Sequence, residues 1–132
     1  MKKFFLLLLT VFASLPYSFS QTDANEEDRV YTVAETMPEY PGGKDALSRF
    51  INNQMKRYPV ASNPTNRGRV VCQFIVEKNG TLSNVEVTRS AGEPFLNSEA
   101  VRIIESMPRW TPGQNQGQPV RVRYSLPINF NQ

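Results

Sequence analysis

The nucleophilic and ionisable side chains set the first limits on what this chain can do. Its 132 residues include no histidine and a single cysteine, Cys72. Without histidine, the commonest metal ligand, the usual proton shuttle and the Ser-His and Cys-His nucleophiles are missing. Cys72 stands between apolar residues in an alternating run, which predicts a buried, unreactive thiol. The sequence therefore predicts neither a catalytic residue nor a metal site.

Carboxylates and one glycine pair are the remaining candidates for chemistry. Gly42-Gly43-Lys44 matches a phosphate-binding loop only in part, because Asp45 replaces the required Ser or Thr and Pro38 stands where the first glycine belongs. The carboxylates that could form an acid–base pair fall at positions expected to be exposed, and we interpret them as solvated charges. They are Glu77, Glu86, Glu99 and Glu105. We expect a protein that is not an enzyme and has no cofactor and no small-molecule substrate.

The first 20 residues have the layout of a secretory signal peptide. Lys2 and Lys3 precede an apolar stretch from Phe4 to Phe12, and Ser18-Phe19-Ser20 is a small-x-small cleavage site. Cleavage there predicts export to the periplasm. If the segment were retained, it would anchor the protein in the inner membrane instead.

Two regions follow the signal peptide. Residues 21–36 are polar and acidic at first, which predicts a mostly disordered leader, although Val30-Tyr31-Thr32-Val33 is β-prone enough for a short strand or extended arm. Residues 37–132 carry the periodic patterns of one domain. Their positive charge excess is mild and includes no basic cluster or aromatic stacking platform, which argues against a nucleic-acid partner.

Apolar spacing predicts two amphipathic helices. The first runs from about Lys44 to Met55, after a proline- and glycine-rich segment, and the second starts near Pro94 and ends before Pro108. Trp110, which follows the second helix, is expected in the core or at its rim. The glycine- and glutamine-rich stretch from 111 to 118 is expected to be a loop.

Three strands complete the pattern. Residues 70–77 alternate in polarity and lead through Asn79-Gly80, the preferred pair for a tight hairpin turn, into a returning strand that ends near Ser90. The last segment, Val120 to Phe130, alternates strictly, so that one of its faces is apolar. Pro127 has no N–H to donate, which predicts an edge position for this strand. The predicted fold is α+β, with a three-stranded antiparallel sheet and two helices packed on one face.

These features together resemble the TonB C-terminal domain. Tyr58-Pro59 follows the first helix, Gly68 opens a strand, Asn79-Gly80 forms the hairpin, and the second helix leads into Arg109-Trp110-Thr111-Pro112-Gly113 before the final alternating strand. Met37 to Gly43, followed by Tyr58-Pro59, is similar to the variant common in the Bacteroidetes.

The resemblance implies a periplasmic protein-binding function in TonB-dependent transport. The family's domain binds an extended segment of an outer-membrane transporter, the TonB box, which adds as a strand to the sheet edge. Arg121, Arg123 and Asn129 would select side chains of the partner, unless they only keep the edge soluble. The residues expected to bind the partner are Tyr58, Pro59, Arg121, Val122, Arg123, Tyr124, Ser125, Leu126, Pro127, Ile128 and Asn129.

Two other functions are compatible with the sequence. A retained N-terminal segment would make the chain a membrane-anchored short energy transducer. The domain could also be a structural envelope module that binds glycan or forms a homodimer through its sheet edge. In the leading interpretation the partner is a transporter segment or another envelope protein.

Overall fold

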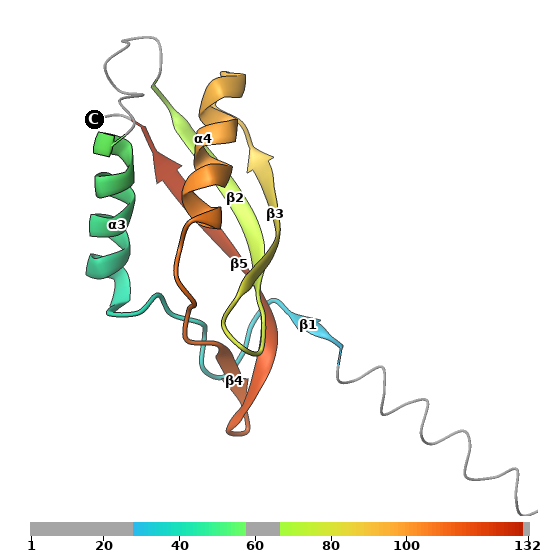
Figure 1. Ribbon diagram of the computed structural model, residues 1–132. Helices are drawn as coiled ribbons and strands as arrows, with labels where there is room; N and C mark the ends of the chain where they lie inside the picture. The colour runs from blue at the N-terminus through green and yellow to red at the C-terminus, as the bar shows by residue number, and fades with distance from the viewer. Residues whose placement is uncertain (1–27, 58–66, 131–132) are drawn as a thin grey trace, which may run out of the picture.

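The computed structural model describes residues 28–57 and 67–130, and Figure 1 shows their arrangement. The signal peptide expected at 1–20 and the Tyr58-Pro59 pair lie outside these residues. In chain order the elements are β1 (Val30–Tyr31), α3 (Gly43–Arg57), β2 (Arg69–Val76), β3 (Leu82–Arg89), α4 (Pro94–Glu105), β4 (Gly113–Asn115) and β5 (Gln118–Asn129).

The strands form one mixed sheet in the order β1-β5-β2-β3, with β4 paired to β5 beside this path. The three long strands, β5, β2 and β3, are antiparallel to their neighbours, as predicted, whereas β1 runs parallel to β5. The α+β prediction is confirmed, but the sheet has five described strands and not three. The two additional strands contain only two and three residues, too few for an alternating pattern to be visible in the sequence.

Turn geometry differs from the expectation in two places. Gly80 has a φ of +89°, but Asn79 is not among the residues with positive φ, and the Glu77 N–H bonds to the Thr81 carbonyl at 2.8 Å. The hairpin loop is therefore longer than the predicted two residues. Two consecutive residues of positive φ, the pattern of a type I′ turn, occur instead at Gln116 (52°) and Gly117 (75°), where β4 turns into β5. The stretch expected to be a loop thus contains a hairpin.

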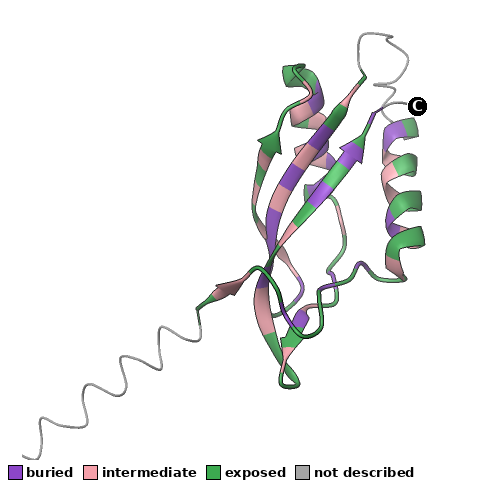
Figure 2. Ribbon diagram, turned by 180° about the vertical axis from the view of Figure 1, so that it is seen from behind, coloured by how far each residue is buried: buried purple, intermediate pink, exposed green. Residues whose placement is uncertain are grey.

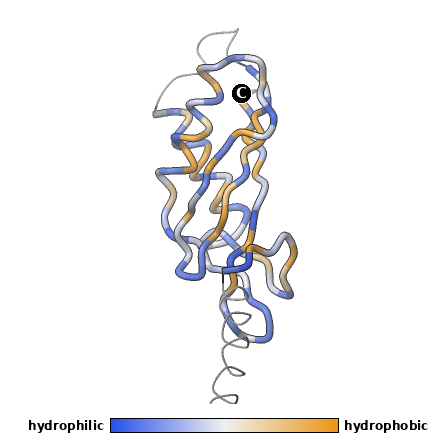
Figure 3. Tube along the Cα trace, turned by 90° about the vertical axis from the view of Figure 1, so that its right-hand side faces the viewer, coloured by the Kyte–Doolittle hydropathy of each residue, from blue (hydrophilic) through white to orange (hydrophobic). Residues whose placement is uncertain are grey.

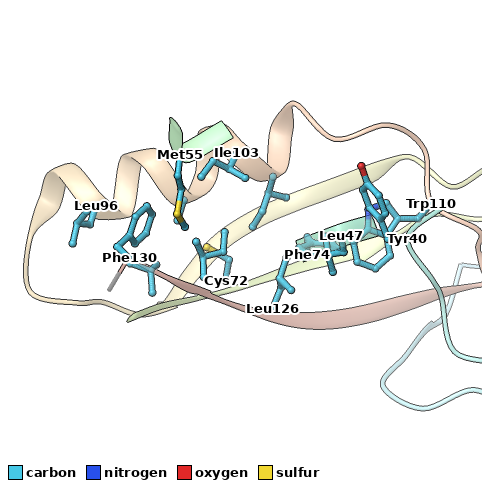
Figure 4. Close-up of a cluster of buried hydrophobic side chains, with 14 of the residues drawn as sticks. Tyr40, Leu47, Met55, Cys72, Phe74, Leu96, Ile103, Trp110, Leu126 and Phe130 are labelled. Carbon is cyan, nitrogen blue, oxygen red and sulfur yellow. The ribbon is translucent and has the colours of Figure 1, made fainter. Parts of the chain in front are cut away.

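Both helices contribute side chains to one core against the strands, and Figure 4 shows α4 over the sheet with labelled side chains of this core between them. Leu47 and Met55 of α3 and Leu96 and Ile103 of α4 meet the strands in one apolar cluster, to which Cys72 and Trp110 also belong. Burying these side chains is the main stabilising contribution. Cys72 is fully buried, and burial raises the pKa of its thiol to about 11, which fits the predicted inert role.

The alternation along β5 is visible in the structure. Val122, Leu126 and Ile128 are buried, whereas Arg123 and Ser125 are exposed, and Figure 2 shows the resulting bands along the strand. Figure 3 shows that apolar and polar residues are interspersed along the trace. The prediction of a strand with one apolar and one polar face is confirmed.

Helix α3 lies beside β5, on the side away from β2, in both of the opposite views (Figures 1 and 2). Helix α4 lies over the other part of the sheet, with its buried residues against β2 and β3. The border of the sheet at β5 therefore has α3 beside it, whereas α4 covers the part of the sheet that contains β3.

Candidate functional site: the open edge of β5

One backbone hydrogen bond fixes the direction in which the peptide groups of β5 point. The Phe130 N–H donates to the Gly68 carbonyl at 2.7 Å, on the β2 side. β2 and β5 pair without a register shift from Arg69↔Asn129 to Val76↔Val122. Peptide groups of alternate residues point to alternate sides of an antiparallel strand. The even-numbered residues from 122 to 130 therefore face β2, and the odd-numbered residues face away from it.

Pro127 is one of these odd-numbered residues. Its missing N–H lies on the side away from β2, which explains how a proline fits into an unbroken ladder. On that side, the chain offers the N–H groups of Arg123, Ser125 and Asn129 and the carbonyl groups of all four residues from this set. We call this row, from Arg123 to Asn129, the open edge. Within residues 28–57 and 67–130, no strand pairs with it.

β1 pairs with the two residues of β5 that directly precede the open edge. Val30 pairs with Arg121 and Tyr31 with Val122, in parallel orientation. The Arg121 side chain strengthens this contact, since its Nη1 donates to the Asp28 carbonyl at 2.8 Å. Among the described residues, β5 is thus paired with a strand on both sides at Arg121 and Val122, and with a strand on one side only from Arg123 onward.

Glu77, which directly follows the last residue of β2, holds Arg121 in place. Arg121 Nε donates to Glu77 Oε1 at 2.7 Å and Nη2 to Oε2 at 3.2 Å, while the Ser83 hydroxyl also donates to Oε2. About three-quarters of each of the two charged side chains is buried. These hydrogen bonds, that of Arg121 foremost, lower the pKa of the Glu77 carboxyl. Arg121 is consequently bonded within the protein, and its expected role in selecting side chains of the partner stays a prediction.

The other predicted binding residues lie where the alternation places them. Arg123, Ser125, Pro127 and Asn129 are exposed along the open edge. Tyr124 is half-buried, and Leu126 and Ile128 belong to the core. The structure therefore brings the predicted strand together as one continuous row, whereas Tyr58 and Pro59 lie outside the described residues.

Trp110 packs against the helix side of the sheet. It is buried, and its ring packs edge-to-face against Phe74 of β2 and Tyr124 of β5, with ring centroids 5.4 Å and 5.0 Å apart. The Trp110 backbone N–H also donates to the Gly80 carbonyl at 2.9 Å. The expected core role of Trp110 is confirmed.

A few functional features could not be seen in the sequence. β1 contributes to the site only by pairing with β5. The run Val30 to Val33 indicated an extended segment, but not which strand it pairs with.

In the described part of the chain, no group of three or more His, Cys, Asp and Glu side chains could hold a metal ion. No helix among the same residues combines the length and apolar character needed to cross a membrane.

Comparison with known families now identifies the fold. A family model described as the Gram-negative bacterial TonB protein C-terminal matches residues 54–132, more than half of the chain. The chain belongs to this family. The match confirms the resemblance found in the sequence. No significant match was found among the curated proteins or among the solved structures.

Membership in the TonB C-terminal family sets a general function. Domains of this family are periplasmic protein-interaction modules that contact outer-membrane transporters in TonB-dependent transport. The matched region begins within α3 and contains every strand except β1. The family match therefore covers the whole open edge, whereas β1 and the first turns of α3 precede it.

Proposed function

We propose that this domain captures an extended segment of an outer-membrane transporter, or of another envelope protein, by adding it as a strand to the open edge of β5. The unbroken ladder between β5 and β2 carries the proposal, together with the finding that no strand among the described residues pairs with the other side of β5 from Arg123 onward. A regular edge offers donors and acceptors at the spacing that a visiting strand needs.

The side chains of the edge fit this role. Arg123, Ser125 and Asn129 are exposed beside the row of free peptide groups, where they would contact side chains on the solvent face of the visiting strand. The core side chains Leu126 and Ile128 hold the backbone of β5 in place, so the edge is formed before the partner arrives. A preformed edge reduces the entropy cost of binding.

Peptide titration of the isotopically labelled full chain tests the proposal. Peptides from the N-terminal segments of outer-membrane transporters should shift the amide signals of Arg123 and Ser125, which face the visitor. Binding that shifts only signals of β3, Leu82 to Arg89, would place the docking site on the opposite border and contradict the proposal.

Two substitutions separate backbone pairing from side-chain effects. Ser125→Pro removes one N–H from the open edge without removing a backbone hydrogen bond to β2, although the exposed bond from Gln73 Nε2 to the Ser125 hydroxyl is lost. We expect peptide binding to weaken about tenfold. Pro127→Ala adds an N–H to the same row and should strengthen binding. Unchanged affinity in both variants, with the melting temperature preserved, would exclude strand addition.

The same edge could pair two copies of this chain, since exposed regular edges invite self-association. Light scattering over a concentration series distinguishes the two outcomes. A monomer that binds peptide supports capture of a partner, whereas a dimer that peptides cannot dissociate supports the structural role.

A further inference from the structure

A hollow opens at the start of the open edge, on the helix side of the sheet. It has a volume of about 320 Å³, and its walls come from the segment Met37–Tyr40, the first turns of α3, Trp110 and Tyr124. Such a volume is at the lower end for ligand sites, which suits one side chain better than a cofactor. Apolar surface predominates in the lining, to which Leu47, Tyr40 and Trp110 contribute, although the charged residues Glu39 and Lys44 also take part in it.

Tyr124 links this hollow to the open edge. Residues directly opposite each other on paired strands point their side chains to the same face of the sheet. Tyr124 points to the helix side, where its ring packs on Trp110 with centroids 5.0 Å apart. A visiting residue opposite Tyr124 would therefore direct its own side chain to the helix side, at the mouth of the hollow.

Two further observations indicate that the hollow is suited to an occupant. Met37 is 41% exposed, although it is a large apolar side chain in the lining. The indole N–H of Trp110 is buried and has no hydrogen-bond acceptor among the residues that the structure describes. A buried donor without an acceptor costs stability, so the wall of the hollow at Trp110 is not fully satisfied within the described residues.

We propose that this hollow receives one large uncharged side chain of the visiting strand, from the position opposite Tyr124. The inference rests on the proposed strand addition and adds a side-chain requirement to it. A charged side chain is disfavoured because it would lose its hydration against the apolar lining. A small side chain would leave the lining exposed and gain little. The walls formed by Met37, Pro38 and Tyr40 precede the region matched by the family model.

Selection from a random heptapeptide library displayed against the full chain tests this inference. The selected peptides should share one position that carries a large uncharged residue, and replacing it by alanine should weaken binding about tenfold or more. Trp110 is the only tryptophan of the chain, so its indole N–H gives a single signal. This signal should shift with the selected peptide and not with its alanine derivative.

Substitutions in the wall provide the matched comparison. Met37→Phe should fill the hollow and Met37→Glu should place a charge in it, and both should reduce peptide binding. Phe95→Ala is the control, because Phe95 is a large side chain, 51% exposed, that does not line the hollow. Melting temperatures of all three variants separate a loss of binding from a loss of stability, because the Met37 sulfur also accepts a hydrogen bond from the Ala34 N–H at 3.4 Å.

The outcomes distinguish this inference from the proposed function. Peptides that shift the amides of Arg123 and Ser125 but neither move the Trp110 indole signal nor respond to Met37 substitutions would refute the side-chain pocket and leave strand addition standing. If no selected peptide shifts the Arg123 and Ser125 amides, strand addition itself fails, and the pocket proposal fails with it.

Discussion

The two long borders of this sheet are built differently, although both belong to the same three antiparallel strands. β5 pairs with β2 in an unbroken register. β3 pairs with the other side of β2 through two register shifts, and Asn84 within it has a φ of 51°. Irregular strands present their peptide groups at uneven spacing and discourage pairing. The backbone geometry of β3 therefore makes its border less suited to a visiting strand than that of β5.

The β5 border is limited by other means. β1 pairs with Arg121 and Val122, and Pro127 removes one donor from the residues that follow them. The stretch around Arg123 to Leu126 is left as the most regular free backbone on the sheet. Proline and an attached short strand are known ways to keep an edge from aggregating while leaving part of it usable.

Trp110 offers the strongest way to disturb this arrangement, because it contacts both borders. Its ring packs on Tyr124 of β5, and its backbone bonds to Gly80 in the hairpin that leads to β3. We expect Trp110→Ala to lower the free energy of unfolding by about 3–5 kcal/mol. Denaturant unfolding measures this loss. A variant that keeps its stability but loses peptide binding would show that Trp110 serves the partner and not the core.

Gly80→Ala should disturb only the hairpin side. A Cβ at Gly80 would clash with the Trp110 carbonyl oxygen, and the φ of +89° is unfavourable for alanine. Destabilisation of about 1–3 kcal/mol is expected from thermal unfolding.

Gly117→Ala is the matched control for this substitution. Gly117 also has a positive φ, but no atom lies within 4 Å of the position that a Cβ would take, so only the conformational cost applies. Equal losses in the two variants would show that the contact between the hairpin and Trp110 is unimportant.

Pro127→Ala tests whether the missing donor keeps β5 from pairing with a second copy. Restoring the N–H completes the row, and two copies would then form two additional hydrogen bonds across a symmetric interface, which should tighten self-association about tenfold. Sedimentation velocity over a concentration series measures the change. Glu86→Ala on β3 is the control, since it alters an exposed side chain while the irregular backbone remains. Association of the Glu86 variant alone would reverse the ranking of the two borders.

Much of the difference between the borders could be anticipated from the sequence, and the reasons are local. The strict alternation from Val120 to Phe130 predicted one apolar and one polar face for β5. Pro127 predicted that this strand lies at an edge of the sheet. The helices followed from apolar spacing, with ends within about two residues of those observed. Patterns of this kind depend only on neighbours along the chain.

Long-range pairing could not be anticipated in the same way. Nothing in Val30-Tyr31 specifies Arg121 and Val122 as its partners, because two residues carry no register information. The irregularity at Asn84 was equally hidden, since it depends on how β3 accommodates β2. The hollow beside Tyr124 combines segments from four parts of the chain, and no single motif marks it.

Removing the ion pair between Glu77 and Arg121 has the smallest expected effect on stability. It tests whether this ion pair sets the boundary of the open edge at Arg123. Because the pKa of the folded Glu77 carboxyl lies below its unfolded value, its contribution to stability is complete above the unfolded pKa and is lost as pH falls through the folded pKa. Glu77→Gln should therefore cost about 1 kcal/mol or less at neutral pH, with the difference from wild type vanishing in acid. Hydrogen exchange should report faster exchange at Tyr31, because Arg121 also bonds the Asp28 carbonyl and loses its restraint. If Tyr31 remains equally protected in the variant, backbone pairing alone holds β1, and the boundary of the open edge at Arg123 does not depend on this ion pair.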